Sequence, residues 1–138
     1  MSETAAACGA CEAAPVTLAA DIGAHHHTSA DHVLLGDGST EILQLCAAAF
    51  TGPGKTVVIA EPTFEAIARF SRTSGAEVKS VPLTAAYVHD LPKMLAAAGG
   101  SGLIYVCNPN NPTGTITGKD TLRSFPVIVP VGLFGLQT

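Results

Sequence analysis

The sequence predicts an α/β fold, a three-layer α/β/α sandwich with a mostly parallel sheet. Apolar runs rich in β-branched residues, at 56–60 and 103–107, are typical of parallel strands that are covered on both faces. Segments with helical spacing of apolar residues alternate with these runs, and Gly- and Pro-rich turns separate the two kinds of segment. In such sheets ligands bind beyond the carboxyl ends of the strands. Two polar loops, 36–40 and 108–114, are expected at these ends.

The expected elements begin at Asp31 and alternate along the chain, and most boundaries carry Gly, Pro or a helix-capping residue. In order, they are a strand at 32–35, a helix at 41–50, a strand at 56–60, a helix at 64–74 ended by Gly75, a strand at 77–81, a helix at 91–98 capped by Asp90, a strand at 103–107 and a short helix at 119–124. We divide the chain into a poorly ordered Ala-rich leader (1–30), one domain (31–125) and an atypical uncharged apolar tail (126–138).

Composition excludes several classes of function. The chain has 138 residues, enough for one domain, and 47% of them are hydrophobic, so a globular fold is expected. Its net charge is −4 and its seven Lys and Arg residues are scattered, which argues against a nucleic-acid partner. No apolar run reaches the ~18 residues that span a bilayer, and the N-terminus lacks the basic residues of a secretory signal. A cytoplasmic location is therefore expected by default.

The four cysteines do not predict a metal site. Cys46 and Cys107 lie in apolar helix and strand patterns, where cysteine is usually a small core residue. Cys8 and Cys11 form a C-x-x-C pair, and the tract His25-His26-His27 could supply nitrogen ligands. The pair has no second C-x-x-C and no histidines at zinc spacing, so we expect no metal.

A relaxed P-loop pattern occurs at Ala49–Thr56 and is rejected on its context. A P-loop needs a strand before the glycine loop and a helix after it, so that main-chain amides surround the phosphates. Here the order is reversed, because a helix precedes the loop and a strand follows Lys55. Carbonyl groups at the end of a helix repel phosphate. We expect an ordinary helix-to-strand turn with Lys55 on the surface.

The two strand-end loops have the chemistry of a binding site. Residues 36–41, G-D-G-S-T-E, enter a helix whose first amides lack internal partners and favour an anion, although an ordinary N-cap has the same composition. Residues 108–114, N-P-N-N-P-T-G, follow a buried strand and contain two Asn-Pro steps. X-Pro bonds in a tertiary context can be fixed as cis. An asparagine held in such a stiff loop offers a well-placed donor to a ligand oxygen.

With these motifs the sequence resembles the fold-type-I, pyridoxal-phosphate (PLP)-dependent aminotransferases of class I/II, most closely the histidinol-phosphate aminotransferase-like branch. Residues 108–114 are similar to that family's N-P-x-N-P-T-G loop, residues 36–41 to its phosphate turn, and residues 61–65, E-P-T-F-E, to its ring-binding segment. The similarity runs from about residue 31 to 125, which would be part of the family's large, cofactor-binding domain.

The resemblance implies a role for particular residues. The amides of Gly38, Ser39 and Thr40 would bind the phosphate of PLP, Phe64 would stack on its ring, and Asn111 would donate to its phenolic oxygen. For Phe64, a core phenylalanine at the start of a helix is an equal alternative. Pro62 and Pro112 would follow cis peptide bonds. The family further implies amino acid (or histidinol-phosphate-like) and 2-oxo acid substrates, and a homodimer.

The resemblance also implies what the chain lacks, because the family's catalytic lysine lies far beyond the N-P-T-G loop. The lysines of this chain, at positions 55, 79, 93 and 119, do not match that lysine's motif, and we assign no catalytic residue. The chain is therefore expected to be a truncated or frame-altered piece without transaminase activity. A non-catalytic PLP- or phosphate-binding or interaction protein is the alternative. Nucleotide binding is a distant third.

Overall fold

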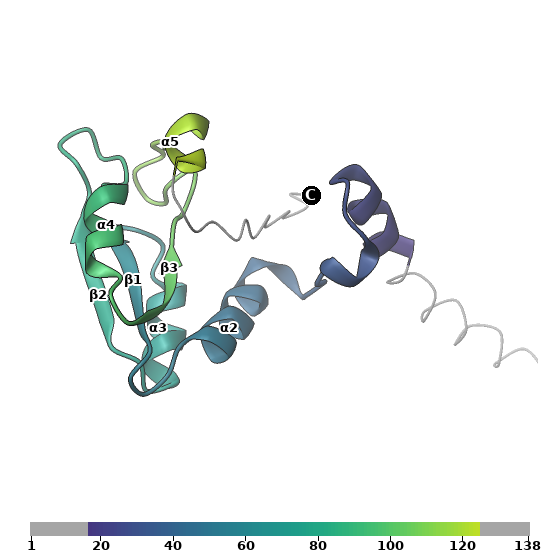
Figure 1. The fold of residues 1–138 in the computed structure, drawn as a ribbon, viewed down its shortest axis with the longest axis horizontal. Coiled ribbons are helices and arrows are strands. Elements are labelled where there is room, and N and C mark those ends of the chain that lie inside the picture. Colours follow the sequence, from purple (N-terminus) through teal and green to yellow (C-terminus); the bar gives the residue numbers. More distant parts are fainter. Residues whose placement is uncertain (1–16, 125–138) are drawn as a thin grey trace, which may run out of the picture. The chain divides into compact units, whose positions relative to one another are not determined.

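The computed structural model describes residues 17–124 (Figure 1). The chain divides into two compact units, and the division falls between Asp37 and Gly38. In the first unit, residues 17–25 are helical and a short 3-10 helix, η1, spans Ala30–His32. The prediction of a strand at 32–35 is wrong, because His32 ends the 3-10 helix and residues 33–36 form no regular structure. An apolar run becomes a strand only beside a pairing partner, and Leu34 is 66% exposed instead of covered.

The second unit is built on three parallel strands, β1 (Thr56–Glu61), β2 (Val78–Pro82) and β3 (Ser101–Tyr105). The strand order is β2-β1-β3, so β1 lies in the centre (Figure 1). Residues 57–60 are all buried, which is the pattern of a strand covered on both faces. The parallel sheet and the three strands predicted for this part of the chain are confirmed.

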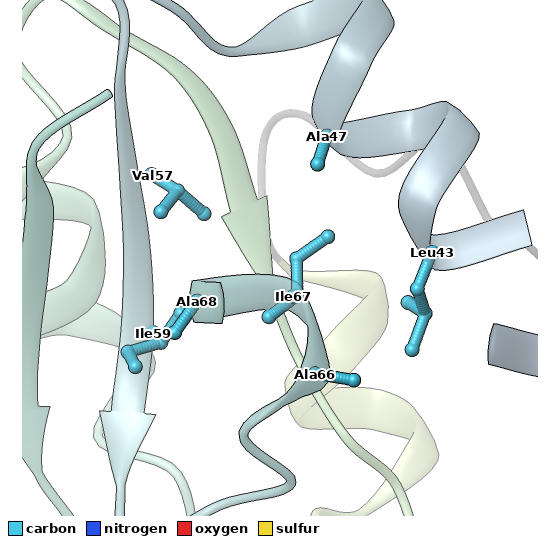
Figure 2. Close-up of a cluster of buried hydrophobic side chains, with 7 residues drawn as sticks. All are labelled: Leu43, Ala47, Val57, Ile59, Ala66, Ile67 and Ala68. Atoms are coloured by element: carbon cyan, nitrogen blue, oxygen red, sulfur yellow. The ribbon is translucent and has the colours of Figure 1, made fainter. Parts of the chain in front are cut away.

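Helices cover both faces of the sheet, so the three-layer arrangement is confirmed. On one face α3 (Ala66–Thr73) packs against alternate residues of β1, and α2 (Gly38–Phe50) packs against α3 in the same cluster. On the other face, α4 (Leu91–Ala97) packs against the intervening residues. The first cluster, drawn in Figure 2, contains Leu43, Ala47, Val57, Ile59, Ala66, Ile67 and Ala68; the second contains Val58, Ala60, Val81, Leu91 and Met94.

α2 and β1 run in opposite directions. Figure 2 shows Ala47 level with Val57 near the start of β1, and Leu43 nearer the end where the arrowhead of β1 lies. The helix therefore runs opposite to the strand that follows it. It begins at Gly38, three residues earlier than predicted, because the polar residues of the turn already adopt helical structure.

The remaining helix boundaries follow local chemistry. Asp90 caps α4 by accepting a hydrogen bond from the amide of Lys93 at 3.2 Å, as predicted, and also forms an ion pair of 2.7 Å with its ammonium group. Gly75, after α3, has the positive φ of 78° that favours glycine. A last helix, α5, spans Lys119–Arg123. Within residues 17–124, no helix is long and apolar enough to cross a membrane.

The P-loop-like segment forms the turn that sequence order predicted. Gly52 and Lys55 exchange main-chain hydrogen bonds of 2.9 and 3.1 Å between the end of α2 and the start of β1. This turn lies at the amino end of β1, away from the edge where α3 begins. Lys55 is exposed. The position and the direction of the adjoining helix both disfavour a phosphate site there.

The main chains of α2 and β3 meet at Gly102. A Cβ atom added to this glycine would overlap the carbonyl oxygen of Phe50, the last residue of α2, and would lie 3.3 Å from the Cβ of Lys55. The pairing of β1 with β3 shifts register at the same level, between Thr56 and Val57. Only a residue without a side chain fits between these backbones.

We predict that Gly102→Ala lowers the free energy of unfolding by about 2–3 kcal/mol, because main-chain atoms must move to admit the methyl group. Urea unfolding followed by circular dichroism measures this loss. Gly99→Ala is the matched control, since a Cβ added there meets no atom within 4 Å. Equal stability of the two variants would contradict the close approach of α2 and β3.

Candidate functional site

The buried side chain of Asn110 joins two loops that follow different strands. Its Nδ2 group donates to the carbonyl oxygen of Pro62 at 3.1 Å and to the Thr113 hydroxyl at 2.8 Å. Its Oδ1 atom accepts from the Thr63 hydroxyl at 2.7 Å. Asn110 is 1% exposed, so these three bonds satisfy its carboxamide away from water. The loop after β1 and the loop after β3 are thereby fixed side by side at the carboxyl edge.

The direction of the hydrogen bonds around Asn110 is determined. The Pro62 carbonyl can only accept, so the carboxamide must present its nitrogen to it. The Thr115 hydroxyl donates to the main-chain carbonyl of Tyr87. It therefore accepts the 2.7 Å bond from the Thr113 hydroxyl, which in turn accepts from Asn110. These hydrogen bonds form one chain, which runs from the side-chain amide of Asn110 through two threonine hydroxyls to the carbonyl of Tyr87.

A second set of contacts closes the loop after β3 at its other end. The side chain of Asn108 accepts from the main-chain amide of Thr117 at 2.9 Å and donates to the carbonyl of the same residue at 3.2 Å. The Thr117 hydroxyl lies 3.0 Å from Nδ1 of His89. His89 and Thr117 are each 4% exposed. The segment before α4 therefore supports the loop from a third direction.

Of the residues predicted to bind a ring, Asn111 is exposed and Phe64 is half-buried. Asn111 follows the buried Asn110, and its carboxamide forms no hydrogen bond with any residue that the structure describes. It is available to a ligand. Phe64 follows Thr63 and packs against the core cluster of α2, α3 and β1. One side of its ring is therefore a core side chain, as the alternative interpretation of this residue expected. Its remaining surface is accessible.

The predicted anion-binding residues form the first turn of α2. Gly38, Ser39 and Thr40 are exposed, and the amides of a first helical turn have no acceptor within the helix. Gly38 has a positive φ of 76°, and no atom lies within 4 Å of an added Cβ. Glycine is therefore required here by the main-chain conformation and not by a close neighbour. Leu43, one turn further along, belongs to the cluster against which Phe64 packs.

Hydrogen bonds through Asn110 join the loops of Phe64 and Asn111, and the first turn of α2 begins the helix that carries Leu43 of the Phe64 cluster. Free amides with a favourable helix dipole suit a phosphate, an aromatic face suits a planar ring, and a free carboxamide suits an anionic oxygen. This set of groups fits a phosphorylated pyridine such as PLP.

Burial controls the ionisation of two groups near the loops. Desolvation lowers the pKa of His89, which favours its neutral form at neutral pH. Desolvation, together with a hydrogen bond to Cys107, raises the pKa of Tyr105, so its hydroxyl stays protonated. At the start of α4, hydrogen bonds from Lys93 lower the pKa of Asp90. The contact between His89 and the Thr117 hydroxyl is therefore one between two neutral groups.

The sequence pattern did not identify every residue that builds the site. Asn110 and His89 were missed as supports, because hydrogen bonds across 47 and 28 residues leave no local signal. The predicted cis bonds before Pro62 and Pro112 are confirmed, and the bond before Pro109 is also cis.

No group of three or more metal-binding side chains occurs among residues 17–124. Cys46 and Cys107 are half-buried thiols there, and burial raises the pKa of Cys46. The pair Cys8 and Cys11 lies outside the described residues.

Comparison with known proteins gives a consistent family. The family described as "Aminotransferase class I and II" matches residues 11–128. A histidinol-phosphate aminotransferase of Symbiobacterium thermophilum is 45% identical over 102 residues, which cover 73% of this chain and 28% of that enzyme. An aromatic amino acid aminotransferase of Streptomyces coelicolor is 43% identical over 100 residues, covering 72% and 28%.

Solved structures agree. A protein from Erwinia carotovora atroseptica, provisionally assigned as a histidinol-phosphate aminotransferase, matches with a TM-score of 0.76 and 31% identity, over 80% of this chain and 33% of that one. The histidinol-phosphate aminotransferase of Sinorhizobium meliloti, solved with pyridoxal-5'-phosphate, gives a TM-score of 0.65 and 25% identity, over 71% and 27%. The chain thus spans about a third or less of these relatives. Because the family match includes both site loops, this chain belongs to the class I and II aminotransferases.

Proposed function

We propose that this chain supplies the phosphate-binding and ring-binding residues of a PLP-dependent aminotransferase. The observation that carries the proposal is the bonding of Asn110 to Pro62 and Thr63, which holds Phe64 and Asn111 on adjacent loops. Family membership supports the same conclusion, and a structural neighbour was solved with pyridoxal-5'-phosphate. A helix-turn phosphate site alone would not specify a ring.

Each group has a distinct task towards the cofactor. The amides of Gly38, Ser39 and Thr40 bind the phosphate, because their unpaired N–H groups and the dipole of α2 favour an anion. Phe64 orients the ring by contact with its face. Asn111 donates to the phenolic oxygen and favours its anionic form. Bound PLP supplies the reactive aldehyde and the electron-withdrawing ring for amino-group transfer.

We further propose the substrates, the oligomeric state and the location of the whole protein from its relatives. Histidinol-phosphate and aromatic amino acid aminotransferases among the relatives support an amino acid or histidinol-phosphate-like donor and a 2-oxo acid acceptor. A homodimer and a cytoplasmic location belong to the same proposal. They rest on the relatives, which are much longer than this chain.

The phosphate and ring contacts can be tested separately with pyridoxine 5'-phosphate and pyridoxine, which lack the aldehyde and cannot react with surface lysines. We expect the phosphate ester to bind at least about tenfold more tightly, since charge-assisted hydrogen bonds are strong. Ser39→Pro removes one amide where the first turn tolerates proline, and should weaken the ester only. Asn111→Ala should weaken both compounds. Fluorescence titration of the full chain gives the dissociation constants.

Equal affinity for the two compounds, or no saturable binding up to millimolar concentration, would refute the cofactor assignment. Weaker binding of both compounds by Ser39→Pro would place the ring, and not the phosphate, at α2. Lys55→Ala serves as the control because Lys55 lies in the turn before β1. A loss of phosphate-ester affinity in that variant would instead support the P-loop reading.

Asn110 and Asn111 should separate structure from binding. Asn110→Ala leaves the Pro62 carbonyl and the Thr63 hydroxyl without their partner, and we expect a loss of about 2–3 kcal/mol in the free energy of unfolding. Asn111→Ala removes an exposed side chain and should change stability by less than about 0.5 kcal/mol while weakening the binding of both pyridine compounds. Urea unfolding beside the titration checks both. Similar stability losses in the two variants would contradict these roles.

The lysines of the chain should not replace a catalytic lysine. The Nζ atom of Lys79 donates to the carbonyl of Ala97 at 3.4 Å, and Lys93 pairs with Asp90. Lys55 lies at the amino end of β1, and Lys119 is the exposed first residue of α5. We therefore expect no transaminase activity, and scattered labelling after PLP treatment and borohydride reduction. Peptide mapping by mass spectrometry measures this. Stoichiometric labelling of a single lysine would show that the chain retains a reactive site.

A further inference from the structure

His89 is a buried polar residue that the proposed cofactor contacts do not use. It precedes the Asp90 cap of α4, is 4% exposed, and has Nδ1 within 3.0 Å of the Thr117 hydroxyl. Its Nε2 atom is buried without a partner among the residues that the structure describes. Burying an imidazole costs free energy unless it is hydrogen-bonded, so the bond to Thr117 is the polar contact that offsets this cost.

Thr117 is also where the loop after β3 closes. Both main-chain groups of Thr117 are bonded to the side chain of Asn108, nine residues earlier. The hydroxyl of the same residue is held by His89, from the segment between β2 and α4. The loop that bears Asn111 is therefore fixed by Asn110 in its middle and by Thr117 at its end.

We propose that His89 is a positioning residue for Asn111, acting through Thr117 and Asn108. Asn111 itself is exposed and forms no hydrogen bond with residues 17–124, so the closed loop alone determines where its carboxamide lies. When the bond from His89 is lost, Thr117 keeps its main-chain bonds but its buried hydroxyl loses a partner. The loop then closes less often, and Asn111 occupies its position for a smaller fraction of time.

The loop effect can be measured without any cofactor. Hydrogen exchange of the full chain, resolved by NMR, reports the amide of Thr117, which donates to Asn108. In His89→Leu and in Thr117→Val, we expect this amide to exchange about tenfold faster relative to the β1 amides. His89→Asn and Thr117→Ser retain polar groups and should restore slow exchange. Leu91→Ala, which removes a core side chain two residues away, should instead affect loop and β1 amides alike.

The cofactor effect is a second readout, which rests on the proposed function. The dissociation constant of pyridoxine 5'-phosphate should rise about tenfold in His89→Leu and recover in His89→Asn, whereas Leu91→Ala should leave it unchanged under folding conditions. Faster exchange with an unchanged dissociation constant would overturn the positioning role. Unchanged exchange in both His89→Leu and Thr117→Val would overturn the loop support itself.

The two proposals can fail separately. If the parent chain does not bind pyridoxine 5'-phosphate, the proposed function fails while the exchange data still decide whether His89 supports the loop. If His89→Leu does not fold, Thr117→Val provides the same test, because it removes only the hydroxyl that His89 contacts. Slow exchange at Thr117 in a folded Thr117→Val variant would then refute the inference.

Discussion

The site depends on one buried carboxamide. Asn110 bonds to Pro62, Thr63 and Thr113, and its burial makes each of these bonds costly to lose. An exposed asparagine would exchange such bonds with water at little cost. In this position, the carboxamide converts two separate strand-end loops into one unit. The neighbours of the bonded residues in the sequence, Phe64 and Asn111, are thereby set in place together.

The sheet was predictable because its signal is local and strong. Four successive buried residues in β1 can occur only in a strand with both faces covered, and that pattern is visible as an unbroken apolar run. The run at 32–35 is also mostly apolar, but no strand forms there. Composition indicates how well the side chains of a segment would pack in a buried strand. Pairing depends on partners elsewhere in the chain, which composition does not describe.

The site was predictable only in part, for the same reason. Gly38, Phe64 and Asn111 lie in motifs that a family resemblance can identify. The supports are different, because Asn110 bonds across 47 residues and His89 across 28. A histidine before a helix cap, or a second asparagine within a loop, has many ordinary explanations. Three-dimensional contacts are needed to separate these supports from the residues that face a ligand.

The close approach of Gly102 and Phe50 has a mechanical consequence for the opposite end of α2. Ser39 and Phe50 are separated by about 17 Å of helix, at ~1.5 Å per residue. If the helix behaves as a stiff rod with its pivot at the glycine, a tilt of ~5° there displaces the first turn by roughly 1.5 Å. That distance is comparable to half a hydrogen bond. The position of the amides proposed to bind phosphate is therefore sensitive to a contact at the other end of the helix.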